Sequence, residues 1–496
     1  MKNQVQLITY VDRLGGGGLT HLHQRLTQGE HNPLRQALGG VHLLPFFYPI
    51  DGADAGFDPI DHTQVDQRLG DWSDIRSLGQ DLDVMADVIV NHMSSQSPQF
   101  QDYSAKGAAS EYHGMFLTLD AVFPGGATGA QLTSVYRPRP GLPLSVTTLA
   151  DGRKEVLWTT FTPQQIDINV EHPQGQAYLK GILQRFADSG IRMIRLDAAG
   201  YAIKRAGQPC FMMPETFDFI ARFSAQARDL GMEVLVEIHS YYQRQIEIAR
   251  QVDWVYDFAL PPLVLHAFAF RTAEPLKHWI RIRPRNALTV LDTHDGIGII
   301  DIGADAADRQ GSPGLVPPAE LDALVDWIHD NCGGQSRQAT GAAASNLDLY
   351  QVNCTYLDAL AGNARDYLLA RAIQFFLPGV PQVYYVGLLG GRNDMELLAQ
   401  SKVGRDINRH HYSAGEIDVA LQTPLVQRLL QLMSLRNHHP AFGGEFSLLE
   451  SGPSALALRW TQGPHLAELQ LDFAGPSQHQ LRFSQDGQAE LLLRLD

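Results

Sequence analysis

The chain has 496 residues, 44% of them hydrophobic, and a formal net charge of -15 at pH 7. A chain of this length and hydrophobic content can bury a large core in one big domain or in a few smaller ones. The negative charge argues against binding to nucleic acids or to anionic membranes, because like charges repel each other at long range.

The N-terminus and the cysteines exclude further classes. The first residues, MKNQVQLITYVDRLGG, lack the apolar core of a signal peptide, and no stretch reaches the roughly 18 uninterrupted apolar residues of a membrane helix. We therefore expect a cytoplasmic protein that neither spans nor anchors to a membrane. Cys210, Cys332 and Cys354 are widely spaced and form no CxxC pair, which predicts reduced thiols rather than disulfides or a zinc site.

Short apolar runs recur along the chain and predict its strands. They occupy residues 5–10, 41–47, 84–92, 191–198, 233–239, 254–260, 287–295 and 380–387. Continuous apolar strands joined by helices are typical of a parallel sheet whose outer face is covered. The eightfold count favours an α/β fold of the (β/α)8 type, a TIM barrel, over an open sheet.

Two connecting stretches show the helical pattern clearly. Residues 177–190 place apolar side chains at positions 179, 182, 183 and 186, the spacing of one helix face, and stop at Gly190. Residues 214–231 open on Pro214 and close on Gly231. We expect both stretches to be helices that link one barrel strand to the next.

Two long stretches interrupt this alternation and suggest a domain organisation. Residues 93–170 are rich in Gly, Pro and Thr, and residues 297–360 follow the seventh strand. We expect both to be inserted subdomains, with the barrel formed by residues 1–92, 171–296 and 361–441. Short alternating runs in residues 442–496 predict a small C-terminal antiparallel β domain.

Acidic residues follow three of the predicted strands. Arg195 and Asp197 are two residues apart, so the pleat points both side chains to one face, and Glu237 and His239 repeat this arrangement on the next strand. Asp295 ends the seventh. Because active sites of these barrels lie at the carboxyl ends of the strands, we expect the three carboxylates to meet over one cavity.

Such a set fits glycosyl transfer, which needs one ionised carboxylate and one protonated carboxyl group. Asp197, kept ionised by Arg195, is the predicted nucleophile, Glu237 the acid/base, and Asp295 the stabiliser of the positively charged transition state. A single strand-end acid is more often a salt-bridge partner or a cap, but three at corresponding positions favour catalysis. No HExxH pair or dinucleotide fingerprint is present; GGGG at 15–18 lacks the required spacing.

Four ordered motifs resemble the signature regions of the α-amylase superfamily, glycoside hydrolase family 13. They are DVIVNH (87–92), IRLDA (194–198), VEIH (236–239) and THD (293–295). Longer stretches such as QFFLPGVPQVYYVG (374–387) and GRDINRHHY (404–412) are similar to the bacterial sucrose phosphorylase branch. The resemblance runs from residue 1 to about residue 440, and Thr293, where many hydrolases of the family carry Asn, also favours that branch.

The resemblance implies the same three catalytic roles and a set of substrate contacts. It implies that the donor glucose is held by Asp54, His92, Arg195, His294 and Arg405, with Phe57 stacked on its apolar face. It implies phosphate contacts for Arg139, His239 and Tyr350, fructose contacts for Asp348 and Gln351, and acceptor-side positions for Phe161 and Gln165. Tyr201 is a further candidate for a substrate contact, and a role in packing is an equal alternative for it. The other candidates could instead be turn residues, core residues or solvated surface residues.

The implied reaction is a retaining transfer of the glucosyl unit of sucrose to inorganic phosphate. Phosphate needs local cations, and Arg137 and Arg139 lie in one Pro-rich stretch, 136–143. Asn91 corresponds to a calcium position in many amylases, but its acidic companions are not identifiable from sequence, so we expect no metal and no organic cofactor. The resemblance also implies a homodimer. A sucrose hydrolase, a phosphorylase of sucrose 6'-phosphate, glucosylglycerol or glucosylglycerate, and a non-catalytic barrel remain alternatives.

Overall fold

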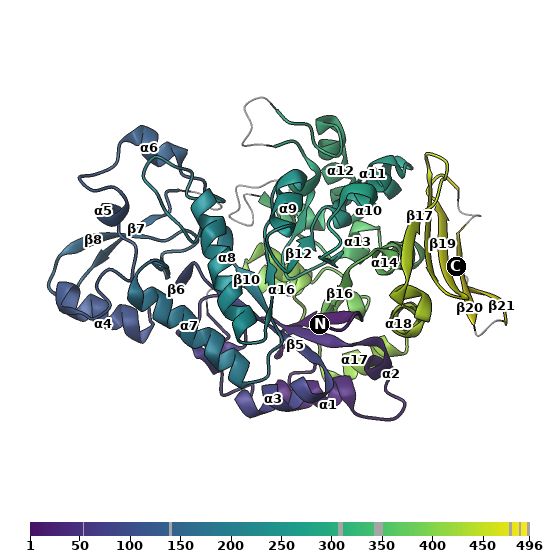
Figure 1. The fold of residues 1–496 in the computed structure, drawn as a ribbon, viewed down its shortest axis with the longest axis horizontal. Helices are drawn as coiled ribbons and strands as arrows, with labels where there is room; N and C mark the ends of the chain where they lie inside the picture. Colours follow the sequence, from purple (N-terminus) through teal and green to yellow (C-terminus); the bar gives the residue numbers. More distant parts are fainter. Residues whose placement is uncertain are drawn as a thin grey trace.

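The fold is a closed barrel flanked on two sides by smaller elements (Figure 1). The computed structural model describes residues 1–52, 54–137, 141–305, 311–341, 351–475, 479–485 and 488–493. Among the helices described, none combines the length and apolar character needed to cross a lipid bilayer.

Eight parallel strands close the barrel in the order β1-β16-β13-β12-β11-β10-β5-β2. Each overlaps one predicted apolar run: β1 (Gln6–Thr9), β2 (Gly40–Leu43), β5 (Asp83–Ile89), β10 (Met193–Asp197), β11 (Glu233–Val236), β12 (Trp254–Asp257), β13 (Ala287–Thr289) and β16 (Val380–Tyr384). The predicted (β/α)8 barrel is therefore confirmed. Several runs were predicted to extend further, because the residues after the last paired position stay buried in the loops above the barrel.

Helices cover the outside of the barrel, among them α1 (Gly18–Thr27), α3 (Trp72–Asp81), α7 (Pro173–Asp188), α8 (Pro214–Asp229), α9 (Tyr242–Ala249), α10 (Leu260–Phe270), α11 (Glu274–Ile282), α14 (Ala364–Phe376) and α18 (Pro424–His438). Both predicted helices are present. Helix α7 buries the four predicted apolar positions, and it begins at a proline four residues before the predicted stretch.

The segment between β5 and α7 lies to one side of the barrel, at the left of Figure 1. It contains α4 (Pro98–Lys106), α5 (Leu119–Val122), α6 (Gly129–Ser134) and two small antiparallel pairs, β6 (His92–Ser94) with β9 (Gln165–Asp167) and β7 (Leu144–Thr148) with β8 (Lys154–Trp158). Its apolar side chains form two clusters separate from the main core. Beyond β13, β14 (Ile297–Gly298) pairs with β15 (Gln351–Val352), and α12 (Pro318–Asn331) lies between them in sequence.

The C-terminal segment forms an antiparallel sheet in the order β17 (Glu445–Leu448), β18 (Ala455–Gln462), β19 (His465–Asp472), β20 (Gln480–Gln485) and β21 (Gln488–Leu493). This confirms the predicted antiparallel C-terminal β structure. The sheet shares the main apolar core, and Trp460 Nε1 donates a hydrogen bond to the main-chain oxygen of Phe376 at 2.7 Å. The domain boundaries at residues 92, 170, 296, 360 and 441 stay predictions.

Candidate active site

A cavity of about 350 Å³ opens at the carboxyl ends of the barrel strands. Its walls come from barrel loops and from the two interrupting segments. The predicted site residues that line it are Asp54, Phe57, His92, Phe161, Asp197, Tyr201, Glu237, His239, His294, Asp295, Gln351 and Arg405. Gln165 and Arg195 stand behind the wall and contact residues that line it.

Asp197 is the last residue of β10, and the backbone turns sharply after it. Ala198 adopts the left-handed conformation at φ 54°, which costs a residue with a Cβ about 1–2 kcal/mol. The turn leads into Ala199, Gly200 and Tyr201, and this brings Tyr201 back to the cavity wall. The small residues that follow Asp197 therefore place an acid and a ring at the same opening.

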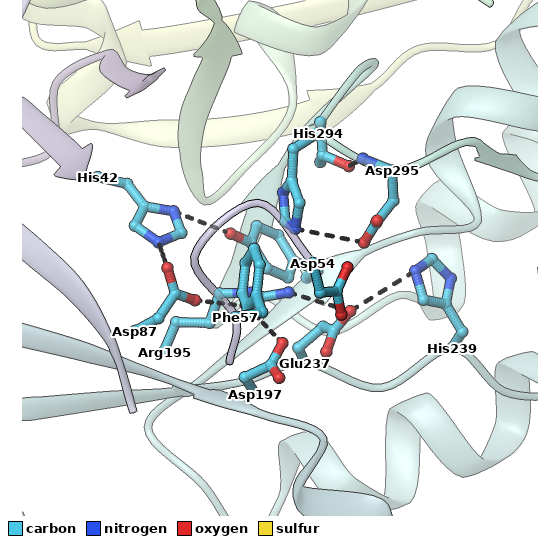
Figure 2. A network of polar contacts seen from close by, with 12 residues as sticks. His42, Asp54, Phe57, Asp87, Arg195, Asp197, Glu237, His239, His294 and Asp295 are labelled. Atoms are coloured by element: carbon cyan, nitrogen blue, oxygen red, sulfur yellow. Dashed lines mark hydrogen bonds and ion pairs between the residues drawn. The ribbon is translucent and has the colours of Figure 1, made fainter. Parts of the chain in front are cut away.

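Arg195 connects two of the acids. Its Nη1 lies 2.9 Å from Asp197 Oδ1, and its Nη2 lies 3.1 Å from Glu237 Oε1. The register of β10 and β5 places Arg195 directly opposite Asp87, whose carboxylate accepts a further hydrogen bond from Nη1. One buried guanidinium thus holds three carboxyl groups together (Figure 2).

The surroundings of Asp197 act on its charge in two directions. Burial raises the pKa of Asp197 well above its usual value, and the nearby charge of Glu237 adds to this effect, while Arg195 opposes it. The sequence shows the neighbouring arginine but not the depth of burial. The effect expected of Arg195 is therefore present, and burial works against it.

Asp295 lies six positions beyond the end of β13, on a loop. Arg405 Nη1 lies 2.7 Å from its Oδ1, and His294 Nε2 lies 3.5 Å from its Oδ2. Burial alone would raise the pKa of Asp295, but Arg405, His294 and Arg409 together hold it well below the usual range. Burial lowers the pKa of His294 to about 3. Asp295 is therefore the permanently ionised acid of the three.

The wall formed by Asp54, Phe57, His92 and Gln165 is a single polar network with one apolar face. Gln165 Nε2 lies 3.2 Å from Asp54 Oδ2 and 3.1 Å from His92 Nε2, which in turn lies 3.0 Å from the main-chain oxygen of Phe57. Burial lowers the pKa of His92, so this ring is neutral. The Phe57 ring stacks on His294 with 5.0 Å between centroids.

Aromatic rings form another part of the wall, and sequence reasoning missed two of them. Tyr136 and Phe211 line the cavity and stack on each other with 4.4 Å between their ring centroids. The ring centroids of Phe211 and Tyr201 lie 4.7 Å apart. A Cβ on Gly200 would lie 2.8 Å from the Phe211 ring, so glycine is needed for this packing. Two sequence features could have indicated this aromatic packing. Tyr136 directly precedes Arg137, and Gly200 follows the predicted nucleophile Asp197 by three positions.

His239 is a further cationic residue of the site, beside the arginines. Its Nδ1 lies 2.9 Å from Asp301 Oδ2, its ring stacks on Phe258 at 3.9 Å, and its Nε2 lies 3.9 Å from Glu237 Oε1. Burial opposes protonation, but the carboxylates of Asp301, Glu237 and Asp295 raise the pKa of His239 to about 9. The ring therefore carries a positive charge at neutral pH.

Glu237, His239 and Asp295 each offer a potential ligand atom, and these atoms lie within 4.8 Å of one another. A metal ion there would have to displace the proton of His239, whose other ring nitrogen is already held by Asp301. Arg195 and Arg405 further offset the negative charge of the two acids. These contacts favour an anionic or neutral ligand over a divalent cation.

Comparison with known proteins places the chain in a family. Residues 36–252 match the family described as alpha amylase, catalytic domain. The chain is 59% identical over 474 residues to a sucrose phosphorylase of Agrobacterium vitis, with 96% of each chain covered. This chain belongs to the α-amylase family. It is also 55% identical over 460 residues to a sucrose phosphorylase of Bifidobacterium adolescentis, covering 93% of this chain and 90% of the relative.

A solved phosphorylase structure agrees over nearly the whole chain. The crystal structure of a sucrose 6F-phosphate phosphorylase from Thermoanaerobacter thermosaccharolyticum matches with a TM-score of 0.90 at 36% identity, covering 99% of this chain and 98% of that one. The resemblance to the sucrose phosphorylase branch of the α-amylase family, predicted from the motifs, is therefore confirmed.

Lys204 lies next to Asn91, the residue that the resemblance to amylases associates with calcium. Its ammonium group lies 2.9 Å from Asn91 Oδ1 and 2.8 Å from Asp167 Oδ2, and it also donates to the main-chain oxygen of Tyr201. Asp167 is the acidic companion that the sequence did not reveal, because β9 returns beside β6 and pairs Asp167 with His92. An internal cation already satisfies these oxygens.

The acceptor side is described in part. Arg137 and Gln351 line the cavity. The predicted residues Arg139, Asp348 and Tyr350 lie outside the described residues.

Proposed function

We propose that this protein is a sucrose phosphorylase, which transfers the glucosyl unit of sucrose to inorganic phosphate and forms α-D-glucose 1-phosphate and fructose. The observation that carries the proposal is the meeting of three acids and a cationic His239 at one cavity. The acids match glycosyl transfer, and the cation offers an anionic co-substrate a partner. The identities of 59% and 55% to sucrose phosphorylases support this substrate pair.

In the proposed first step, an Asp197 oxygen attacks the anomeric carbon of glucose while Glu237 gives its proton to the oxygen of the departing fructose. The contact of Arg195 with both carboxyl groups supports these roles, because the guanidinium can follow negative charge from one to the other. Asp295, held ionised by Arg405, stabilises the positive charge that develops on the sugar ring.

In the second step, phosphate replaces fructose, Glu237 takes a proton from it, and a phosphate oxygen attacks the β-glucosyl enzyme. The bond to Asp197 breaks, and two inversions give net retention. We assign donor glucose contacts to Asp54, Phe57, His92, His294 and Arg405. We assign acceptor contacts to Arg139, Phe161, Tyr201, His239, Asp348, Tyr350 and Gln351. Gln165 and Arg195, which were expected to contact substrate, do not line the cavity and instead hold residues that do.

The decisive experiment is incubation of the protein with sucrose, with and without inorganic phosphate. Formation of α-D-glucose 1-phosphate, with fructose release that depends on phosphate, is the expected result. Fructose release at the same rate without phosphate would identify a sucrose hydrolase. Replacing sucrose by sucrose 6'-phosphate, and running the reverse reaction with glycerol or glycerate as acceptor, separates the related phosphorylases.

Three further features belong to this proposal. We propose that no metal or organic cofactor takes part, and full activity after dialysis against EDTA is the test. The Lys204 ammonium among Asn91 and Asp167 supports this. We also propose a cytoplasmic location, which cell fractionation tests. The proposed homodimer rests on the resemblance to the family, and light scattering tests it.

A further inference from the structure

Below the acids, the polar network continues into the interior of the barrel through Asp87 and His42 (Figure 2). Both side chains have no exposed surface, and neither lines the cavity. His42 lies on β2, and the register of β2 and β5 pairs it with Met85, two positions before Asp87. The two residues are therefore fixed by adjacent barrel strands and do not touch substrate in the cavity.

Asp87 divides its two oxygens between two partners. Its Oδ1 accepts a hydrogen bond from Arg195 Nη1, and its Oδ2 lies 3.0 Å from His42 Nε2. On the other side of the ring, His42 Nδ1 lies 3.5 Å from Tyr256 Oη. An imidazole that donates from Nε2 and accepts at Nδ1 fits both contacts. His42 thus occupies the oxygen that Arg195 does not use.

The separate partners of the two Asp87 oxygens determine how Arg195 contacts Asp197 and Glu237. Carboxylate and guanidinium groups favour a two-point contact, in which both oxygens bind two nitrogens. Because His42 holds Oδ2, Asp87 engages Arg195 through one oxygen. The guanidinium then presents Nη1 to Asp197 at 2.9 Å and Nη2 to Glu237 at 3.1 Å. Arg195 Nε is buried without a hydrogen-bond partner among the described residues, so a freed Oδ2 would find the guanidinium able to turn toward it.

We propose that His42 is a positioning residue, which holds Oδ2 of Asp87 so that Arg195 keeps both nitrogens on the Asp197 and Glu237 pair. The inference rests on the proposed function, because it gives His42 a part in that reaction. Loss of the His42 donor should let Asp87 draw the guanidinium away from the two acids. The charge that faces Asp197 comes from Arg195, Glu237, Asp87 and Asp54. A more distant Arg195 would therefore raise the pH at which the nucleophile ionises.

The test compares His42→Phe, which keeps a ring but has no donor, with the wild type over a range of pH. We expect kcat to fall about 10- to 100-fold, as for a displaced catalytic group. We expect the acidic limb of kcat/KM to move upward by about one pH unit. The KM for sucrose should change little, since His42 does not line the cavity.

His62→Phe is the matched control. His62 is also fully buried, and its Nε2 lies 3.1 Å from the main-chain oxygen of Asp87 rather than from the carboxylate. This variant should lose stability as His42→Phe does, but its acidic limb should stay at the wild-type pH. His42→Gln, whose amide can donate to Oδ2 of Asp87, should recover most of kcat. His42→Met should not, because methionine has a similar size to glutamine but no donor.

An acidic limb that stays in place in His42→Phe, or equal activity of His42→Gln and His42→Met, overturns the inference. The Gln and Met pair gives the same answer if the Phe variant does not fold. Fructose release by the wild type that does not depend on phosphate would overturn the proposed function instead. In that case, the acidic limb of the pH dependence of fructose release, compared between the wild type and the His42 variants, decides the role of His42 separately.

Discussion

The ammonium group of Lys204 lies 2.8 Å from Oδ2 of Asp167, and both side chains are buried. Lys204→Met should lower the free energy of unfolding by about 3–5 kcal/mol, because it leaves a buried carboxylate unpaired. Millimolar calcium should recover part of the loss, since the oxygens of Asn91 and Asp167 would face the vacated position. Thermal unfolding with and without calcium measures both effects.

Lys106→Met is the control for this prediction. Lys106 pairs with Asp102 at 2.5 Å, but its side chain is 59% exposed, so the change should cost less than about 1 kcal/mol. A calcium response of the same size in both variants would contradict the expected site at Asn91 and Asp167.

Asp197→Asn and Glu237→Gln should differ in how they depend on the leaving group. Asp197→Asn should lower kcat on the order of 10⁴-fold or more with every donor, because it removes the nucleophile. Glu237→Gln should lose about 10²-fold less with α-D-glucosyl fluoride than with sucrose, since fluoride leaves without a proton. Initial rates with both donors measure this. Equal losses with the two donors would place the acid elsewhere.

The charge of His239 should set an upper pH limit for the binding of phosphate. Its pKa of about 9 means that it is charged below that pH and neutral above it, so the KM for phosphate should rise as the pH passes 9. The raised pKa also contributes stability that is complete below the ordinary value of about 6.5 and is lost as the pH rises through 9. In His239→Asn both dependences should flatten.

The matched control is His410→Asn. His410 also binds a carboxylate, with Nδ1 2.6 Å from Asp394 Oδ2, but it does not line the cavity. Its phosphate dependence should follow that of the wild type. A flattened phosphate dependence in this variant as well would show that His239 has no special part in the limit.

Gly298 keeps His239 and Asp301 together. A Cβ at this position would lie 2.2 Å from Asp301 Oδ2 and 3.2 Å from His239 Nδ1, so Gly298→Ala must displace the pair. We expect a higher KM for phosphate and a smaller change in the KM for sucrose. Gly181→Ala in α7, where a Cβ has open space, should instead stabilise the protein by about 1 kcal/mol. Steady-state kinetics with each substrate varied in turn measures the difference.

The sequence predicted the barrel well because buried parallel strands are continuous apolar runs. It placed the ends of several strands too far along the chain, most of all for β13. This strand ends at Thr289, yet Val290 and Leu291 remain buried, so composition alone does not separate a strand from a buried loop. Asp295 is therefore on a loop, and the rise in the pKa of Asp197 escaped prediction because burial depends on tertiary packing.

The parts of the site that sequence reasoning missed are contacts between distant segments. Phe211 meets Tyr136 from 75 positions away, and Asp167 reaches Lys204 only because β9 returns beside β6. His42 is linked to Arg195 through Asp87, and strand alternation predicts its face but not its partner. Local spacing carries no information on such contacts.

Because the segment between β5 and α7 contributes to two apolar clusters that are separate from the main core, we expect it to unfold separately from the barrel. The C-terminal sheet shares its interior with the barrel, so these parts should lose structure in one concerted transition. The side segment can come apart earlier, and it carries Phe161 and Tyr136 with it. Heating would then inactivate the protein by unfolding one wall of the cavity while Asp197, Glu237 and Asp295 keep their native positions.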